Sequence, residues 1–218
     1  MRDGYIDPHC QYSRGEEIAN SLTHGLGIAA SCVGLIVLVV SASYSGDPNR
    51  IIGVTIFGAS LILLYLASTL YHCLPSPRAK QVLRKLDHAA IYILIAGTYT
   101  PFMLVVVDGP LSWTILSIIW TLALVGVVFK CCWTGRLRRL SLAVYIGMGW
   151  LCVLAFSELL RNTPTSGFVF LVLGGLFYTG GTIFYGWKRL RFNHAIWHLF
   201  VLTGSVMHFL SVYQSVLR

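Results

Sequence analysis

The chain has 218 residues, of which 56% are hydrophobic and only 11% are charged, and its mean hydropathy is +0.72. This composition excludes an ordinary soluble domain. The net charge of +8 would suggest nucleic-acid binding in a soluble protein, but in a membrane protein basic residues chiefly report orientation. We therefore expect no nucleic-acid partner. Instead we predict an all-α integral membrane protein in the cell (plasma or inner) membrane, with a single domain over residues 1–218.

Seven apolar runs are each about 20 residues long, which is enough to cross the hydrocarbon core. They predict seven transmembrane helices joined by turns rich in proline, glycine and polar residues. Residues 1–20 are expected to form a polar tail, with no cleaved signal peptide. The segment Leu-Pro-Ser-Pro at 74–77 stops the second span because proline cannot continue a helix, and 78–86 is expected to be a basic loop. The predicted spans are 21–43, 51–73, 87–107, 111–131, 140–160, 167–187 and 193–213.

Basic residues are divided unequally between the two sides of this predicted bundle. The opposite side from the N-terminal tail holds only Arg50, Arg161 and Arg218, which leaves thirteen of the 16 Lys and Arg residues on the side of the tail. Because positive residues concentrate on the cytoplasmic side, we predict a cytoplasmic N-terminus and a C-terminus outside the cell.

The last apolar run begins with a pair of histidines, His194 and His198, spaced to lie on one helix face. Two imidazoles at this spacing can ligate one metal ion, and a catalytic zinc usually has three protein ligands and an open position. In the predicted orientation His72 ends the second span at the same inner depth, whereas His208 lies about 15 Å deeper. The sequence thus predicts a Zn²⁺ site of His72, His194 and His198. Interfacial histidines paired with headgroups or helix ends are the alternative, because Ala195 stands where H-E-x-x-H enzymes carry glutamate.

Two polar residues near this predicted site are candidates for catalysis. Asp87 is the one acid after Glu17 that falls on the inner side, and it could hold or deprotonate a water whose pKa zinc lowers to about 7. Ser68 is one turn before His72 and could bind a substrate carbonyl or its oxyanion. The alternatives are an N-cap of the third span for Asp87 and a backbone hydrogen bond for Ser68.

Asn20 and His24 open the first span on the same side. For these two residues we expect helix capping and anchoring at the membrane interface.

The motifs that contain these residues resemble those of the bacterial hemolysin III proteins, within the progestin and adipoQ receptor superfamily. The resemblance spans nearly the whole chain. The shared motifs are Glu17-x-x-Asn20-x-x-x-His24, Ser68-x-x-x-His72, Leu86-Asp87-His88, Gly97-Thr-Tyr-Thr-Pro101 and Asn193-His194-Ala-Ile-Trp-His198.

This resemblance implies a seven-helix fold with a cytoplasmic N-terminus and a zinc ion near the inner face. In the adiponectin-receptor branch the matching positions make His72, His194 and His198 the ligands, with Asp87 reaching the zinc through water. Because the sequence shows no long N-terminal domain like that of the animal receptors, we expect no hormone-receptor function. The superfamily also resembles alkaline ceramidases, which hydrolyse a lipid amide.

Three functions follow as hypotheses. The first is a zinc-dependent hydrolase of lipid amides or esters, for which the partner is a membrane lipid substrate or a fatty-acid ligand. The second is a membrane-homeostasis or sensing protein in which zinc is structural. The third is a pore-forming cytolysin, which the family name suggests but which the absence of a long amphipathic segment disfavours. The sequence does not indicate an oligomeric state.

Overall fold

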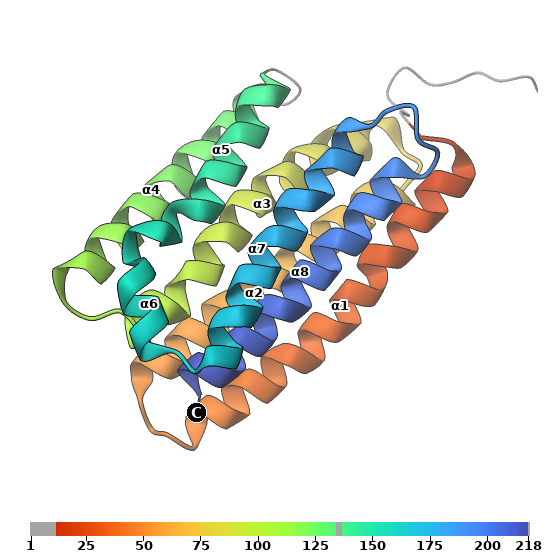
Figure 1. Ribbon diagram of the computed structural model, residues 1–218. Helices are drawn as coiled ribbons and strands as arrows, with labels where there is room; N and C mark the ends of the chain where they lie inside the picture. The colour runs from red at the N-terminus through yellow and green to blue at the C-terminus, as the bar shows by residue number, and fades with distance from the viewer. Residues whose placement is uncertain (1–11, 134–136, 218) are drawn as a thin grey trace, which may run out of the picture.

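The structure, a computed structural model, describes residues 12–133 and 137–217, and within these ranges every regular element is helical (Figure 1). Seven helical segments are long and apolar enough to cross a membrane, which confirms the predicted all-α, seven-span class. The elements are α1 (Arg14–Ser43), α2 (Pro48–Cys73), α3 (Pro77–Val105), α4 (Gly109–Trp133), α5 (Arg138–Trp150), η1 (Leu151–Ala155), α6 (Phe156–Asn162), α7 (Thr165–Gly186) and α8 (Asn193–Val216).

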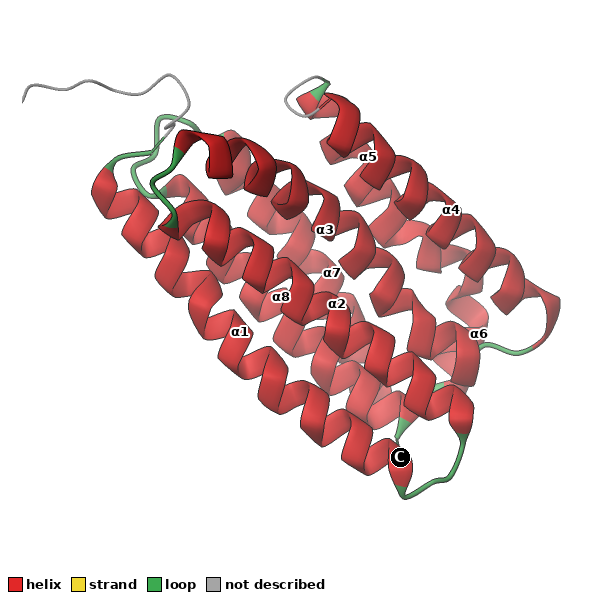
Figure 2. Ribbon diagram, turned by 180° about the vertical axis from the view of Figure 1, so that it is seen from behind, coloured by secondary structure: helices red, strands yellow, loops and turns green. Residues whose placement is uncertain are grey.

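The helices run up and down through one bundle. Helix α8 packs against α1, α2, α3 and α7, while α4, α5 and α6 lie together on one side of the bundle (Figures 1 and 2). Helices α2 and α3 are the most buried of the spanning segments. This topology brings the start of α1, the end of α2, the start of α3 and the start of α8 to the same end of the molecule.

Two helices, α1 and α3, begin more than one turn before the predicted spans. Helix α3 starts at Pro77, because the Ser76 side chain accepts a hydrogen bond from the Ala79 amide and proline suits the first helical position. The prediction of a basic loop at 78–86 is therefore wrong. Charged residues show where a helix leaves the apolar layer, but they do not end the helix.

Helix α1 starts at Arg14 with a capping box. The Ser13 side chain accepts a hydrogen bond from the Glu16 backbone amide, and the Glu16 side chain accepts one from the Ser13 backbone amide. The capping roles expected for Asn20 and His24 are wrong, since both lie well inside α1 and are buried. Asp87 likewise lies inside α3 and does not cap it.

The fifth span is interrupted by the 3₁₀ segment η1. A break of this kind frees backbone groups that lipid cannot satisfy. The Tyr99 hydroxyl of α3 donates to the Met148 carbonyl oxygen at 2.8 Å and accepts from the Cys152 amide at 2.7 Å. Trp150 Nε1 donates to Thr179 Oγ1 of α7 at 2.9 Å. The helix of the fifth span is thus interrupted, but side chains of α3 and α7 provide hydrogen-bond partners at the break.

Tyr99→Phe is expected to lower the stability of the bundle by about 1–3 kcal/mol, because it leaves buried backbone groups at the break without a partner. Thermal unfolding of the protein in detergent would show this as a lower melting temperature. Tyr44→Phe makes the same chemical change at a residue that is 89% exposed, and it is expected to leave the melting temperature unchanged. Equal melting of the two variants would contradict the role assigned to Tyr99.

Candidate metal centre

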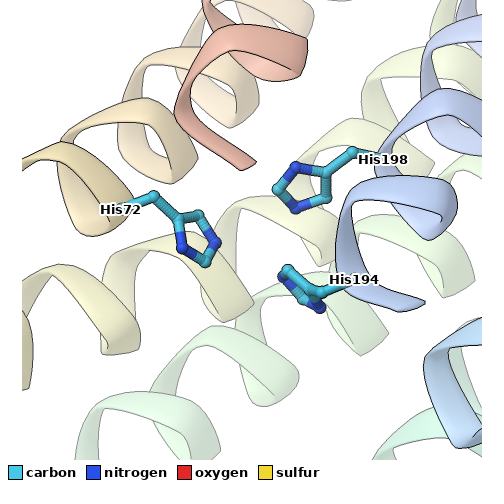
Figure 3. Close-up of side chains that lie close together, drawn as sticks. All are labelled: His72, His194 and His198. Atoms are coloured by element: carbon cyan, nitrogen blue, oxygen red, sulfur yellow. The ribbon is translucent and has the colours of Figure 1, made fainter. Parts of the chain in front are cut away.

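Three histidines from opposite ends of the chain meet inside the bundle. His72 comes from the last turn of α2, and His194 and His198 from the first turns of α8. One nitrogen from each ring lies within 4.8 Å of the other two, and Figure 3 shows the rings turned toward a common point. As whole residues, His72, His194 and His198 are 3%, 7% and 1% exposed. The structure therefore brings together the three residues that the sequence analysis selected.

The ring nitrogens of this histidine cluster fit a metal ion. His72 Nε2 and both nitrogens of His194 are buried and have no hydrogen-bond partner among the described residues. Buried polar atoms are normally satisfied, so these nitrogens call for a ligand. Three neutral imidazoles suit zinc. In a tetrahedral zinc site the nitrogens stand roughly 3.4 Å apart, so rotations that move each ring by about an ångström would close the cluster.

His72 is oriented by a carboxylate from α1. His72 Nδ1 donates to Glu17 Oε2 at 2.6 Å, and Glu17 Oε1 accepts from Lys80 Nζ at 2.7 Å. Lys80 also donates to the Tyr71 carbonyl oxygen at 3.1 Å. A carboxylate on Nδ1 keeps the proton there and presents Nε2 as a metal ligand. Lys80 was not predicted as part of the site, because the basic segment 78–86 that contains it was expected to form a loop.

His198 is oriented by the backbone of α1. Its Nδ1 lies 3.2 Å from the Asn20 carbonyl oxygen and 3.1 Å from Thr23 Oγ1, both of which can accept its proton. The His24 ring stacks on His198 with 3.5 Å between centroids and packs edge-on against Tyr65. The α1 motif of Glu17, Asn20 and His24 therefore surrounds two of the three histidines, which explains its spacing better than contact with the membrane interface does.

Asp87 reaches the same region from α3. It is 8% exposed, and its Oδ2 lies 3.2 Å from His88 Nδ1, an electrostatic contact whose angle does not make a directed hydrogen bond. Together with His194 and His198, Asp87 lines a cavity of about 550 Å³. The carboxylate and two of the three histidines thus face a common space, whereas His72 is outside the cavity lining.

Ser68 is fully buried, and its hydroxyl has no hydrogen-bond partner within the described part of the chain. The backbone hydrogen bond considered for it is therefore not present. Ser68 does not line the cavity, so its catalytic role stays a prediction.

The cavity is apolar away from the histidine cluster. It extends between α3, α5, α7 and α8 to side chains such as Phe102, Leu159 and Phe168, and its volume is that of a small-molecule site. His208 lines this deeper part and lies 3.2 Å from the Leu171 carbonyl oxygen. His208 is outside the cluster, as its distance along the helix predicted.

These features define a multi-pass helical membrane protein with a buried histidine cluster beside an apolar cavity. The family described as "Haemolysin-III related" matches residues 12–209. The chain therefore belongs to the hemolysin III family, which confirms the resemblance inferred from the motifs; in a bacterium its location is the plasma membrane.

Relatives in two bacilli are similar over nearly their whole length. The chain is 49% identical to Hemolysin-3 of Bacillus cereus over 202 residues, which cover 93% of this chain and 92% of that protein. It is 49% identical to the Hemolysin-3 homolog of Bacillus subtilis (strain 168) over 197 residues, or 90% and 92% of the two chains. Similarity extends to the monocyte to macrophage differentiation factor of Homo sapiens, at 29% identity over 224 positions, covering 99% of this chain and 89% of that one.

Proposed function

We propose that this protein is a zinc-dependent hydrolase of lipid amides or esters, with its site near the cytoplasmic face. The observation that supports this is the cluster of buried imidazoles with unpaired nitrogens, two of which, His194 and His198, line the same largely apolar cavity as the Asp87 carboxylate. Zinc bound there would polarise a substrate carbonyl and supply a water of lowered pKa. The cytoplasmic placement follows from the unequal distribution of Lys and Arg along the sequence.

The chain's own residues supply the remaining chemistry. The apolar wall of the cavity holds an acyl chain and excludes bulk water. Asp87 lies at the cavity wall close to the histidines, where its carboxylate takes a proton from the attacking water as general base. The new bond joins the water oxygen to the carbonyl carbon. As the bond to the leaving nitrogen or oxygen breaks, Asp87 returns the proton to that atom.

Two further groups of residues prepare this step. Glu17 and the Asn20 carbonyl hold His72 and His198 with their protons on Nδ1, so neither ring needs to reorient during turnover. The Ser68 hydroxyl is buried one turn before His72 and outside the cavity lining, so we assign it hydrogen bonding with the substrate carbonyl or its oxyanion only if the substrate carbonyl passes the histidines toward α2.

The hydrolase is tested by incubating the purified protein with natural lipid extracts and measuring released fatty acid. His194→Ala is expected to abolish release, since it removes a ligand beside the cavity. Tyr44→Phe, at a residue that is 89% exposed and outside the cavity lining, serves as the control and is expected to keep the activity of the wild type. Equal release from the wild type and His194→Ala would contradict the proposal.

A sensing protein with structural zinc is the second candidate. The observation that favours it is that the cluster joins α2 to α8 and is braced by α1, so a metal would fasten three helices that are distant in sequence. In that case, chelation would lower the melting temperature while wild-type protein released no fatty acid from any extract.

A further inference from the structure

The deep part of the cavity contains an imidazole that does not belong to the histidine cluster. His208 lines the cavity, and α8 carries it about 15 Å farther along the helix than His198. Its Nε2 lies 3.2 Å from the Leu171 carbonyl oxygen. A carbonyl oxygen can only accept, so the proton of the neutral ring is on Nε2, and Nδ1 carries a lone pair. Because Nδ1 is buried and has no hydrogen-bond partner among the described residues, it is an acceptor that lacks a donor.

The His208 ring is held against the backbone of α7. A Cβ atom added at Gly174 would overlap the Cδ2 and Nε2 atoms of this ring, so the ring reaches the Leu171 carbonyl because position 174 has no side chain. Helices α7 and α8 lie side by side (Figures 1 and 2). The imidazole is therefore positioned before any ligand enters, which lowers the entropic cost of binding one.

Three hydroxyl groups near His208 carry one hydrogen more than they use. The Tyr65 hydroxyl donates to Ser205 Oγ at 2.7 Å, and Ser205 Oγ lies 2.7 Å from the Tyr178 hydroxyl, where either group can donate. Three hydroxyls have three hydrogens, but these two contacts use only two of them. When Ser205 donates to Tyr178, the remaining hydrogen is that of Tyr178. Tyr178 lines the cavity, and its ring centre lies 5.3 Å from that of His208.

Two other hydroxyls that line the cavity are already committed as donors. Thr98 Oγ1 donates to the Leu94 carbonyl oxygen at 2.8 Å, and the Tyr99 hydroxyl donates to the Met148 carbonyl oxygen at 2.8 Å. The imidazole and the tyrosine hydroxyl thus offer an acceptor and a donor in a largely apolar wall. A ligand hydroxyl both donates and accepts, so one such group satisfies both partners.

We propose that His208 and Tyr178 form a subsite for a hydroxyl group on the acyl chain of the lipid. The ligand hydroxyl donates to His208 Nδ1 and accepts from the Tyr178 hydroxyl. Carbon–carbon bonds of about 1.5 Å advance an extended chain by about 1.25 Å each, so a group about 15 Å from a carbonyl at the histidine cluster lies roughly twelve bonds along the chain. A plain acyl chain would fill the cavity but leave both protein groups without a partner.

This subsite rests on the proposed hydrolase for the position of the substrate carbonyl, and it narrows the substrate to lipids with a hydroxylated acyl chain. Its test measures binding and does not require turnover. Selective binding without hydrolysis would support the subsite and contradict the hydrolase. Hydrolysis without selective binding would support the hydrolase and contradict the subsite.

The experiment compares three ligands on the full-length purified protein in lipid nanodiscs. They are stearic acid, stearic acid with a hydroxyl on about the twelfth carbon, as the spacing requires, and stearic acid with the hydroxyl beside the carboxyl group. The mid-chain isomer is expected to bind about tenfold more tightly than the other isomer, because it alone brings its hydroxyl to His208 and Tyr178. Trp150 and Trp197 line the cavity, so tryptophan fluorescence can follow binding.

His208→Phe removes the acceptor and Tyr178→Phe removes the donor. Each is expected to reduce the preference for the mid-chain isomer from about tenfold to less than about threefold, while the affinity for stearic acid changes little. Tyr44→Phe makes the same chemical change as Tyr178→Phe outside the cavity lining and is expected to keep the full preference. Tyr178→Phe leaves His208 in contact with the Leu171 carbonyl, so it tests the subsite even if His208→Phe does not fold.

Two results would overturn the proposal. Equal affinity of the wild type for the two hydroxylated isomers would show that the cavity does not distinguish the position of the hydroxyl. A preference for the mid-chain isomer that persists in both His208→Phe and Tyr178→Phe would show that its hydroxyl is bound elsewhere in the cavity.

Discussion

His72→Ala is expected to lower the zinc affinity of the purified protein by more than about 100-fold. Loss of a residue that merely orients a ligand already costs roughly 10–100-fold, and among the described residues His72 supplies one of the three nitrogens that meet in the cluster. The remaining two histidines lie on a single helix, where their i, i+4 spacing alone makes a weak site. Metal analysis after dialysis against a zinc buffer measures the effect directly.

The matched control for this measurement is His208→Ala. His208 is also a buried imidazole of the bundle, but it lies 3.2 Å from a backbone carbonyl oxygen and outside the cluster. The His208→Ala variant should keep the zinc content of the wild type. If His72→Ala retained as much zinc as His208→Ala, then the metal, where present, would be held elsewhere, and both candidate functions would lose their basis.

Glu17→Gln is expected to have two separate effects. It should weaken zinc binding roughly 10–100-fold, because an amide holds the His72 proton less strongly than a carboxylate does. It should also destabilise the protein by about 3–5 kcal/mol, because the Lys80 ammonium would remain buried without its counter-charge. The side chains of Lys80 and Glu17 are only 7% and 14% exposed, so solvent cannot replace the lost partner.

The double variant Glu17→Gln/Lys80→Met separates the two effects. Removing both charges is expected to restore most of the stability, since a buried ion pair can often be replaced by neutral groups at little cost. Zinc affinity should stay low, because the carboxylate on His72 is still absent. Denaturant or thermal unfolding of the metal-free variants, together with zinc titration, tests this. Recovery of both properties in the double variant would show that Glu17 serves Lys80 alone.

Charged residues in this chain do not mark loops. The segment 78–86 was expected to be a loop because it is basic, yet it forms the first turns of α3, and Lys80 within it supports Glu17. The Ser76-Pro77 pair was a usable signal for a helix start. A similar signal, Ser13 followed by Glu16, marked the true start of α1 and would have placed Asn20 and His24 inside that helix.

The sequence by itself determined the class of the protein, because a backbone in lipid must satisfy its own hydrogen bonds and an apolar run of span length can do so only as a helix. It also determined that His194 and His198 share one helix face. Only the tertiary structure decided that His72 meets this pair, that α1 orients two of the three rings, and that Tyr178 and His208 line one cavity. In a membrane helix the face toward lipid is as apolar as the face toward the bundle, so the rotation and partners of each helix cannot be read from its hydrophobic pattern.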